Sequence, residues 1–374
     1  MNDAPARIGD PIESIDTPAL VIELEAFEAN LAAMARFART SGVRLRPHAK
    51  THKCPLIARK QIEAGAVGQC CQKVGEAEAL VDGGVGDILV TNEIVDPRKL
   101  ERLARLATRA RIALCFDHAD AVDAASKAAR AVGVELGALV EVEVGMRRCG
   151  IAGGAPAVAL ARRIAEAPGL RFRGLQAYQG AAQHLQTRAE REHAIAAAAD
   201  AVRATLAELD RAGLACEFVT GAGTGTYRLE VASGVWNELQ AGSYLFMDTE
   251  YARIDGNAAP GRRYDDYAHS LFVLASVMSV PPGRAVLDAG LKSFSAEKGF
   301  PWVHGRAGIE VTGVSDEHTR LELSFAAPTL SLNEKVWLIP GHCDPTINLH
   351  EVYVAVRNGV VEALWPIAAR GASR

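Results

Sequence analysis

Residues 46–55, RPHAKTHKCP, bring two lysines and two histidines together in one short segment. The overlapping stretch VRLRPHAK alternates between apolar and polar residues, and its polar parity holds Arg44, Arg46, His48 and Lys50. Because the side chains of a strand point alternately to its two faces, this pattern predicts a strand over residues 43–50 with one strongly basic face. A lysine that is desolvated, or that lies among like charges, has a lowered pKa and becomes a nucleophile toward aldehydes.

Lys50 closes this strand on its polar side and is the candidate nucleophile. On this segment alone, a solvated lysine at a strand end is an equally good interpretation. Lys53 follows shortly before Pro55, a residue that suits the first turn of a helix, and we expect Lys53 to be a solvated turn lysine.

A second candidate is the glycine-rich segment TGAGTGTY, residues 220–227. Glycines let backbone N–H groups approach an anion closely, and such loops hold phosphates, although a plain tight turn has the same composition. The later segment AGSYLF adds the hydroxyl group of Ser243 and the backbone N–H groups of Gly242 and Tyr244. A lysine that binds an aldehyde, combined with a phosphate-binding loop, indicates pyridoxal 5′-phosphate (PLP).

A third candidate is PGHCDPT, residues 340–346, in which one residue separates His342 from Asp344. If the chain is extended there, both side chains face one side with Cα atoms about 6.5 Å apart, and Cys343 faces away. An imidazole and a carboxylate so placed can share a divalent cation, although a hydrogen-bonded loop pair is the simpler interpretation. His184, in QGAAQH, has two equally open interpretations, a functional residue and a surface histidine.

Short apolar runs alternate with segments of helical length through the first two thirds of the chain. The runs predict strands over residues 43–50, 67–73, 87–92, 111–116, 137–143, 173–179, 216–221 and 237–242. Helices are predicted over residues 26–40, 56–64, 75–82, 97–108, 119–132, 155–167 and 188–212. Such alternation implies a parallel sheet, and eight strands within about 200 residues predict a (β/α)8 barrel.

Functional groups of such barrels lie at the carboxyl ends of the strands. Those ends and the turns after them carry polar side chains, namely Lys50, Gln72, Asn92, Asp117, Glu143, Arg148, Tyr178, Gln179 and Ser243. Because barrel interiors are normally filled by branched apolar side chains, so many polar groups at one rim favour a functional site there. The glycine-rich segment follows the seventh strand, where phosphate sites of these barrels are common.

From residue 266 onward, strand-like runs follow one another without helical segments, and RNGVV is a typical hairpin turn. The early run TPALVIEL, residues 17–24, has no place in an eight-stranded barrel. We therefore expect a barrel domain over residues 25–265 and an antiparallel β domain made of residues 1–24 and 266–374.

The composition is that of an ordinary globular protein, with 374 residues, 49% hydrophobic and 23% charged, and a net charge of -4. This charge does not favour a nucleic acid or an anionic membrane surface as a partner. No run of about 18 apolar residues and no apolar signal-peptide core occurs in the sequence. Seven scattered cysteines favour reduced thiols, and we expect a cytoplasmic protein.

Together these segments resemble the metal-activated, PLP-dependent D-threonine aldolases and 3-hydroxy-D-aspartate aldolases. Those enzymes belong to the alanine racemase-like group, fold type III, which also includes the eukaryotic-type D-serine dehydratases. The resemblance runs over nearly the whole chain, through DTPALVIEL, RPHAKTHK, CCQKVGEAEA, TNEI, VEVEVGMRRCG, GLQAYQG, TGAGTGTY, ELQAGSYLFMD, SDEH and PGHCDPT. It implies an α/β protein with a PLP-binding (β/α)8 barrel and a discontinuous antiparallel β domain, assembled as a head-to-tail homodimer.

The resemblance also implies roles for particular residues. Lys50 is expected to carry PLP as a Schiff base, Arg148 to lie near the phenolic oxygen, and Tyr178 to lie at the pyridine nitrogen. The phosphate group is expected at Thr220, Gly221, Gly223, Thr224, Gly225, Tyr227, Gly242, Ser243 and Tyr244.

His342 and Asp344 are implied as ligands of a divalent metal, and His184 as the base beside the β-substituent of the substrate. The related dehydratases have a cysteine two residues after the histidine, which suits zinc. Asp344 at that position suits a harder cation, foremost Mn²⁺, with Mg²⁺, Co²⁺ or Zn²⁺ as further candidates, and favours the aldolase branch. We expect an enzyme that cleaves D-β-hydroxy-α-amino acids such as D-threonine into glycine and an aldehyde.

Several alternatives stay open. A 3-hydroxy-D-aspartate aldolase would release glyoxylate as the aldehyde. A dehydratase of D-serine or D-threo-3-hydroxyaspartate would remove the β-hydroxyl group as water and release ammonia with a keto acid. A non-catalytic PLP carrier would not need a second domain, and a metal-dependent barrel hydrolase would show no PLP absorbance.

Overall fold

The computed structural model describes residues 4–256 and 263–374, in two compact units. We call Met34–Lys50, Pro55–Gly242 and Ala372–Arg374 the barrel unit. We call Met1–Ala33, Thr51–Cys54 and Ser243–Gly371 the β unit. The domain boundaries expected from the sequence, at residues 25 and 265, stay a prediction.

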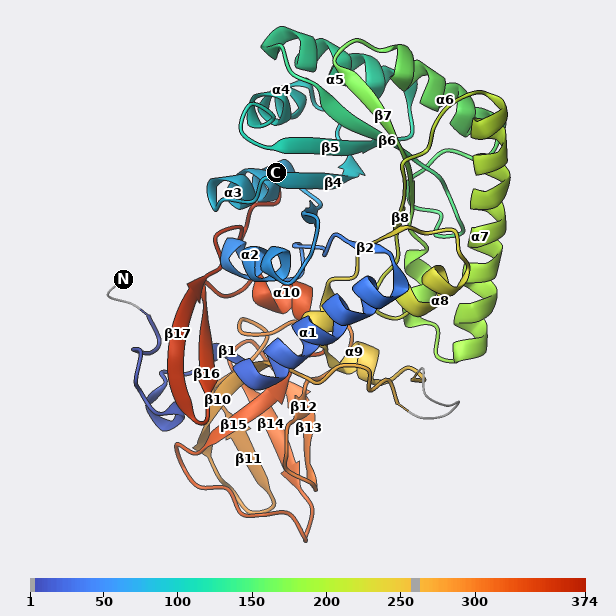
Figure 1. The fold of residues 1–374 in the computed structure, drawn as a ribbon. Helices are drawn as coiled ribbons and strands as arrows, with labels where there is room; N and C mark the ends of the chain where they lie inside the picture. Colours follow the sequence, from blue (N-terminus) through green and yellow to red (C-terminus); the bar gives the residue numbers. More distant parts are fainter. Residues whose placement is uncertain (1–3, 257–262) are drawn as a thin grey trace. The chain divides into compact units, whose positions relative to one another are not determined.

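The barrel unit contains one curled sheet of eight parallel strands in the order β2, β9, β8, β7, β6, β5, β4, β3 (Figure 1). Their bounds are β2 Arg44–Leu45, β3 Gln69–Cys71, β4 Asp87–Glu93, β5 Arg111–Phe116, β6 Leu136–Glu141, β7 Leu170–Ala177, β8 Phe218–Gly221 and β9 Glu238–Leu239. Beyond β2, a parallel bridge between His48 and Cys70 joins the two edge strands. The nitrogen of Cys70 lies 2.9 Å from the carbonyl oxygen of Pro47, and that of Ala49 lies 2.8 Å from the carbonyl oxygen of Cys70. These bonds close the sheet, and the predicted eight-stranded barrel is confirmed.

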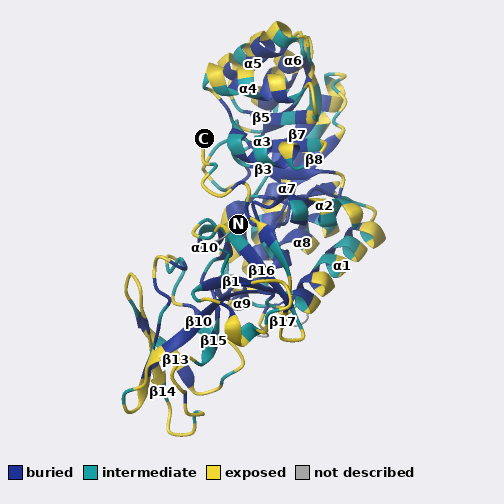
Figure 2. Cartoon of the chain, turned by 90° about the vertical axis from the view of Figure 1, so that its left-hand side faces the viewer, coloured by how far each residue is buried: buried dark blue, intermediate teal, exposed yellow. Residues whose placement is uncertain are grey.

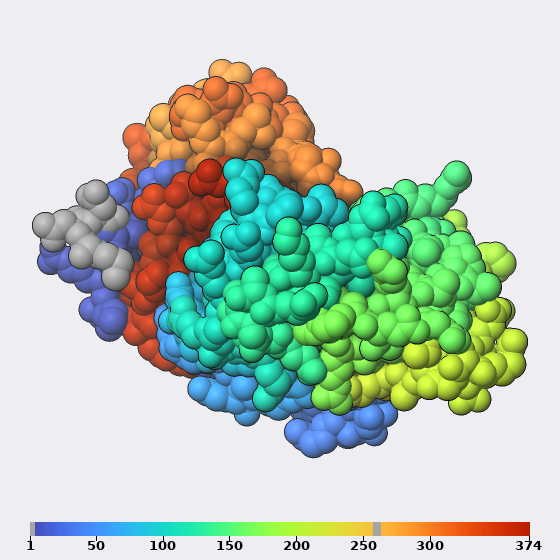
Figure 3. Space-filling model, turned by 90° about the horizontal axis from the view of Figure 1, so that it is seen from above, coloured from blue at the N-terminus to red at the C-terminus, as the bar shows by residue number. Residues whose placement is uncertain are grey.

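Helices connect the strands in the order that the alternating sequence predicts. They are α1 Leu24–Ser41, α2 Pro55–Glu63, α3 Val74–Asp82, α4 Pro97–Leu106, α5 Ala119–Val132, α6 Ala155–Glu166, the short η2 Gly180–His184, α7 Arg188–Arg211 and α8 Tyr227–Ala232. Local signals set their limits: Asp96 caps α4 in front of Pro97, and Gly133 ends α5 with φ of 79°. In the space-filling view of Figure 3, the segments that carry α3 to α6 form one continuous outer surface of this unit.

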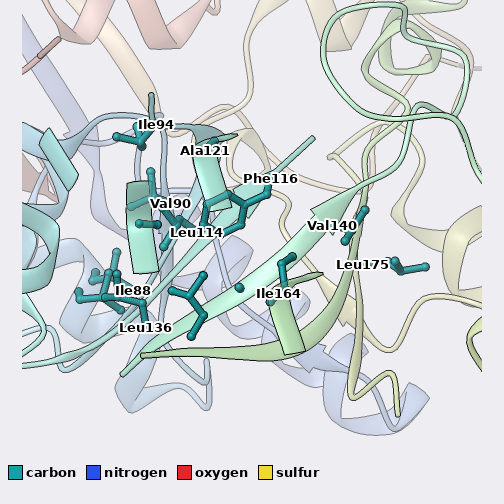
Figure 4. Packing of buried hydrophobic residues seen from close by; sticks show 14 of the residues in the cluster. Ile88, Val90, Ile94, Leu114, Phe116, Ala121, Leu136, Val140, Ile164 and Leu175 are labelled. Atoms are coloured by element: carbon teal, nitrogen blue, oxygen red, sulfur yellow. The ribbon is translucent and has the colours of Figure 1, made fainter. Parts of the chain in front are cut away.

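The main core of the barrel unit lies between the sheet and these helices. Strand residues such as Ile88, Val90 and Leu114 pack there against helix residues such as Ala121 and Ile164, as Figure 4 shows. In Figure 2 the strands of the barrel unit are mostly dark blue, whereas the helices carry buried, intermediate and exposed residues. Burial of this continuous apolar surface is the main force that holds the helices on the sheet.

The β unit is built on a mostly antiparallel sheet in the order β13, β14, β11, β10, β1, β16, β17, and β15 pairs with β10 and β12. The bounds are β1 Ala19–Glu23, β10 Leu271–Ser279, β11 Arg284–Leu287, β12 Trp302–Val303, β13 Ile309–Val314, β14 Thr319–Leu323, β15 Lys335–Ile339, β16 Val352–Arg357 and β17 Val360–Pro366. The early strand β1 lies antiparallel to β10 and parallel to β16. Short helical segments occur here as well, at η1 Ile12–Ser14, η3 Ser243–Leu245, α9 Thr249–Ala252 and α10 Cys343–Ile347. The sequence predicted no helix between the strands after residue 266, and α10 differs from that prediction.

Two features outside the sheets bear on the sequence-based expectations. None of the helices within the described residues is long and apolar enough to cross a membrane. All seven cysteines lie within the described part of the chain, and no disulfide joins any two of them there.

Candidate active site

Lys50 lies in the turn that follows the bridge residue His48, at the carboxyl-end rim of the barrel. Its backbone N–H group donates to Nδ1 of His48 at 3.3 Å, and its side chain is partly buried. The ring of His48 is held in turn, because its Nε2 lies 3.0 Å from Oγ1 of Thr91 and 3.1 Å from Nε2 of Gln72. The closure of the barrel therefore fixes the backbone from which the Lys50 side chain extends.

The arginines before Lys50 do not form the expected basic face. Nε of Arg46 lies 3.0 Å from Oε1 of Glu238, and Nη1 lies 2.5 Å from Oδ1 of Asp87. Arg44 lies 3.7 Å from the other carboxylate oxygen of Glu238. Since these carboxylates compensate both guanidinium groups, the argument that like charges activate Lys50 is wrong.

Lys53 also differs from the expectation, because it is buried rather than solvated. Only 9% of its surface is exposed, and its backbone has φ of 51°. Its carbonyl oxygen accepts a hydrogen bond from the N–H group of Ala369 at 3.0 Å, within the β unit. The local sequence predicted that Lys53 is solvated, but a hydrogen bond from a distant part of the chain holds its backbone inside the β unit.

The loop between β6 and α6, which carries Arg148, is anchored at both ends. Oε1 of Glu143 accepts the N–H groups of Gly145 and Arg147, both at 2.7 Å. Oδ2 of Asp117 accepts the N–H group of Gly150 at 3.1 Å. Two carboxylates from strand ends thus hold the backbone on either side of Arg148.

The side chain of Arg148 lies close to Tyr178 and to a buried acid pair. Its guanidinium carbon lies 5.8 Å from the centre of the Tyr178 ring, and Nη2 lies 3.6 Å from Oε1 of Glu141. Burial and the neighbouring carboxyl group of Glu93 raise the pKa of Glu141 to about 8. One cation and one phenol, the two residues implied for the ring of PLP, therefore lie together on the barrel unit.

The glycine-rich loop after β8 fits closely against the end of β7 and against η2. A Cβ atom on Gly221 would lie 2.2 Å from the carbonyl oxygen of Ala177, and one on Gly223 would lie 2.4 Å from Oε1 of Gln183. Gly225 donates its N–H group to that same oxygen of Gln183, at 3.0 Å. The loop therefore needs glycine at these positions, and the N–H group of Gly225 already has a partner within the protein.

Gln183 is a residue that the sequence did not single out. Its side chain is fully buried, and Nε2 donates to Oγ1 of Thr226 at 2.6 Å. That hydroxyl group donates to Oε1 of Glu230 at 2.7 Å, and burial raises the pKa of Glu230 to about 8. Since the exposed His184 directly follows Gln183 at the end of η2, this chain of bonds ties His184 to the glycine-rich loop.

Three further residues expected at the phosphate group, Thr220, Thr224 and Tyr227, lie in three different settings. The hydroxyl group of Thr220 bonds Glu238 at 3.1 Å and Gln240 at 2.8 Å, inside the barrel. The buried Thr224 lies in the glycine-rich loop itself, and Tyr227 begins α8, where its ring packs edge-on against Phe37 at 4.8 Å.

Gly242, Ser243 and Tyr244 follow β9. Gly242 ends the main segment of the barrel unit, and Ser243 begins η3, whose first backbone N–H groups have no acceptor within the turn. Tyr244 is fully buried in the β unit, with its ring centre 5.5 Å from that of Tyr267. Its expected contribution is therefore its backbone N–H group rather than its side chain.

In the β unit, His342 and Asp344 do not lie on an extended strand. His342 is the N-cap of α10, with φ of -151° and ψ of 126°, and Asp344 lies in the first turn of that helix. The N–H group of Cys343 donates to Oδ2 of the buried Asp248 at 3.1 Å. The expected alternation of side chains is therefore wrong, although both candidate ligands remain at one helix start.

The electrostatic surroundings of His342 are strongly acidic. Burial alone would lower the pKa of His342, but the carboxylates of Asp344, Glu297 and Asp248 raise it above the ordinary value. Nδ1 of His342 lies 2.5 Å from Oε1 of Glu297. Within the described residues no three His, Cys, Asp or Glu side chains form a group that could hold a metal ion, so a cation here would have two protein ligands and several open positions.

Comparisons with known proteins place this arrangement in a family. The model described as alanine racemase, N-terminal domain, matches residues 22–250, and the model described as a serine dehydratase domain matches residues 270–356. A D-threonine aldolase from Arthrobacter sp is 48% identical over 99% of this chain and 97% of its own length. A 3-hydroxy-D-aspartate aldolase from Paracoccus denitrificans (strain Pd 1222) is 46% identical over 99% of this chain and 96% of its own. The crystal structure of D-threonine aldolase from Filomicrobium marinum, 47% identical, superposes with a TM-score of 0.94 and covers 98% of this chain and 99% of that chain.

The chain therefore belongs to the alanine racemase-like family, which implies PLP as its cofactor. Its full-length relatives are named as aldolases, so the protein is an enzyme of the lyase class, and the resemblance drawn from the sequence is confirmed.

Proposed function

We propose that this enzyme uses PLP and a divalent cation to cleave D-β-hydroxy-α-amino acids, D-threonine among them, into glycine and an aldehyde. The observation that carries the proposal is the 48% identity, over 99% of the chain, to a D-threonine aldolase. Asp344 adds to it, because a carboxylate beside an imidazole suits Mn²⁺ or Mg²⁺ rather than the zinc expected for a histidine and a cysteine.

The residues of the barrel unit fit PLP. Gly221 and Gly223 pack so closely against Ala177 and Gln183 that any Cβ atom would clash there. Such a tight glycine-rich turn can present backbone N–H groups to a phosphate group. Lys50 supplies the amine for covalent attachment of the cofactor. Arg148 would compensate the phenolate oxygen, and Tyr178 would contact the pyridine nitrogen, which is consistent with the 5.8 Å between guanidinium carbon and ring centre.

The residues of α10 fit a divalent cation. A neutral imidazole nitrogen and a carboxylate oxygen are both ordinary ligands of Mn²⁺, and the carboxylates around His342 add negative charge. Two protein ligands predict modest and reversible binding, with further positions for water and substrate. We assign the cation to His342 and Asp344.

PLP, when bound, accepts the electron pair that the breaking Cα–Cβ bond releases, and a divalent cation, when bound, lowers the pKa of the β-hydroxyl group. His184 takes the proton of that hydroxyl group, which its exposed position at the end of η2 allows. Gln183 keeps η2 fastened to the glycine-rich loop while this proton moves. One proton added at Cα then completes glycine.

A second candidate is cleavage of 3-hydroxy-D-aspartate, because two relatives named for that substrate are 46% and 45% identical to this chain. A third candidate is dehydration of the substrate, because residues 270–356 match a serine dehydratase domain.

We also propose that the enzyme is a homodimer and that it is located in the cytoplasm.

The deciding experiment offers D-threonine, 3-hydroxy-D-aspartate and D-serine to the PLP-loaded enzyme with added Mn²⁺. Glycine with acetaldehyde supports the first candidate, and glycine with glyoxylate alone supports the second. Ammonia with a keto acid, and no glycine, would contradict both aldolase proposals.

A further inference from the structure

We propose that Glu297 is a positioning residue of the cation site in the β unit. Its carboxylate holds the Nδ1–H group of His342 and thereby leaves Nε2 of the same ring for the cation. This inference rests on the proposed binding of a divalent cation by His342 and Asp344, and it names the residue that orients the imidazole ligand.

The first observation is the contact itself. Nδ1 of His342 and Oε1 of Glu297 are 2.5 Å apart, and 45 residues separate them in the chain. An ionised carboxylate only accepts hydrogen bonds, so Nδ1 must carry the proton. In a neutral imidazole the lone pair then lies on Nε2, and metal-binding histidines commonly donate their other nitrogen to a carboxylate in this way.

The second observation is that bonds within the β unit hold the segment of Glu297 in place. The N–H group of Ser295 donates to Oγ1 of Thr346 at 3.0 Å. That hydroxyl group donates to the carbonyl oxygen of His342 at 2.8 Å. The residue two places before Glu297 is thus bonded through one threonine to the backbone of His342.

The third observation is the close approach of two glycines on the other side of Glu297. A Cβ atom on Gly341 would lie 2.3 Å from the carbonyl oxygen of Gly299. Gly299 itself has φ of 107°, a conformation that favours glycine. Residues 295–299 therefore pack directly on the start of α10, and Glu297 lies between two anchored points.

The neighbouring charged side chains of Lys298 and Asp248 have other main partners, so Glu297 is the group that orients the imidazole ring. Lys298 forms its ion pair with Glu250, with Nζ 3.1 Å from Oε1, and interacts with Glu297 only electrostatically. Asp248 accepts the N–H groups of Cys343 and Tyr251, both at 3.1 Å, and so serves the backbone. Glu297 is the carboxylate that bonds the imidazole ring.

The test measures Mn²⁺ binding to the PLP-loaded enzyme, from the electron paramagnetic resonance signal of free Mn²⁺. Loss of a carboxylate partner behind a ligand histidine typically weakens metal binding about 10–100-fold, which we expect for Glu297→Ala. Glu297→Gln should weaken it less, because the amide oxygen still accepts the Nδ1–H bond. Glu351→Gln is the matched control, since it removes the same charge from a glutamate that pairs with the exposed Arg370.

Three outcomes are distinguishable. Weakened binding in Glu297→Ala with unchanged binding in Glu351→Gln supports the inference. Equal Mn²⁺ affinity of the wild-type enzyme and Glu297→Ala overturns it and leaves the proposed cation site intact. Absence of Mn²⁺ binding by the wild-type enzyme overturns the cation site and this inference together.

A second readout does not depend on the metal. In the metal-free protein, nitrogen-15 spectra of labelled histidines report which ring nitrogen of His342 carries the proton. Wild type should show protonated Nδ1, Glu297→Gln should retain it, and Glu297→Ala should lose the preference. A protonated Nε2 with unprotonated Nδ1 in the neutral wild-type ring would contradict the inference, whatever the stability of the variants.

Discussion

The carboxyl group of Glu141, in the last residue of β6, neighbours that of Glu93, in the last residue of β4, and the two groups interact electrostatically. Oε2 of Glu141 and Oε1 of Glu93 are both buried, and no donor within the described residues reaches either atom. Burial and the neighbouring Glu93 raise the pKa of Glu141 to about 8, so its protonated form is favoured at neutral pH. Because Glu141 also lies 3.6 Å from Arg148, its protonation state changes the charge beside a proposed cofactor residue.

Glu141→Gln should remove a pH-dependent part of the stability. Burial and Glu93 raise the pKa of Glu141 to about 8 in the folded protein, so between about pH 4.5 and 8 the folded state binds more protons than the unfolded state. Stability from this group is therefore present at low pH and is lost as the pH rises toward 8, by at most about 1.4 kcal/mol per pH unit.

Urea unfolding of the PLP-free protein at several pH values between 5 and 8 measures this effect as the difference between wild type and variant. Glu317→Gln, at an exposed glutamate of the β unit, is the control. Parallel pH profiles of wild type and Glu141→Gln would show that Glu141 does not bind this proton.

Lys50 should be the residue that carries PLP covalently. Borohydride reduction of the loaded enzyme followed by peptide mapping should place the label on the peptide of Lys50, and Lys50→Ala should lose the visible absorbance of the bound cofactor. Lys53 is the natural comparison, because it is close in sequence but lies buried in the β unit. Label on Lys53 or Lys73 would reassign the site.

Gln183→Ala should weaken retention of PLP. The substitution removes the acceptor of the Gly225 N–H group and the donor to Thr226, and each buried polar group left unsatisfied costs about 1–3 kcal/mol. The measurements are PLP release on gel filtration and the free energy of unfolding in urea. Gln186→Ala, at an exposed glutamine near the end of the same segment, should behave as wild type, and equal PLP retention in both variants would refute the role of Gln183.

EDTA should abolish cleavage of D-threonine while it leaves the PLP absorbance unchanged, and Mn²⁺ should restore activity better than Zn²⁺. Asp344→Ala should behave like the EDTA-treated enzyme, because one imidazole is left to hold the cation. Full activity of Asp344→Ala in EDTA would exclude the metal role.

Cys343→Ala separates packing from metal binding. The thiol is fully buried, so its loss should lower the free energy of unfolding by about 1–2 kcal/mol. The backbone N–H group that bonds Asp248 remains, so the Mn²⁺ affinity should stay at the wild-type value. A large loss of Mn²⁺ affinity would show that the side chain itself belongs to the site.

The architecture of the barrel was readable from local signals. The predicted strand 111–116 and helix 119–132 coincide with β5 and α5, because apolar periodicity and capping residues act over a few positions. The segment 17–24 was assigned to the second sheet because the barrel had no ninth place, and β1 pairs there with β10 and β16. The sequence also identified which candidate residues lie at the rim of the barrel, because that rim is formed by the carboxyl ends of the predicted strands.

The sequence did not predict which charged side chains form ion pairs with one another. Arg46 has its partners in Glu238 and Asp87, which are 192 and 41 residues away. Sequence spacing showed only a row of basic residues and so suggested an activated lysine. Which charges meet is decided by the closure of the barrel, because that closure brings distant strands side by side.

The start of α10 shows the same limit within a single short motif. The sequence determined that His342 and Asp344 stand two apart, and with them which ligand types are available. Only the tertiary structure decided that this segment is a helix start, because Asp248, 95 residues earlier, accepts the N–H group of Cys343. Only the tertiary structure brings Glu297, 45 residues away, to 2.5 Å from Nδ1 of His342, since a hydrogen bond depends on distance in space and not on separation along the chain.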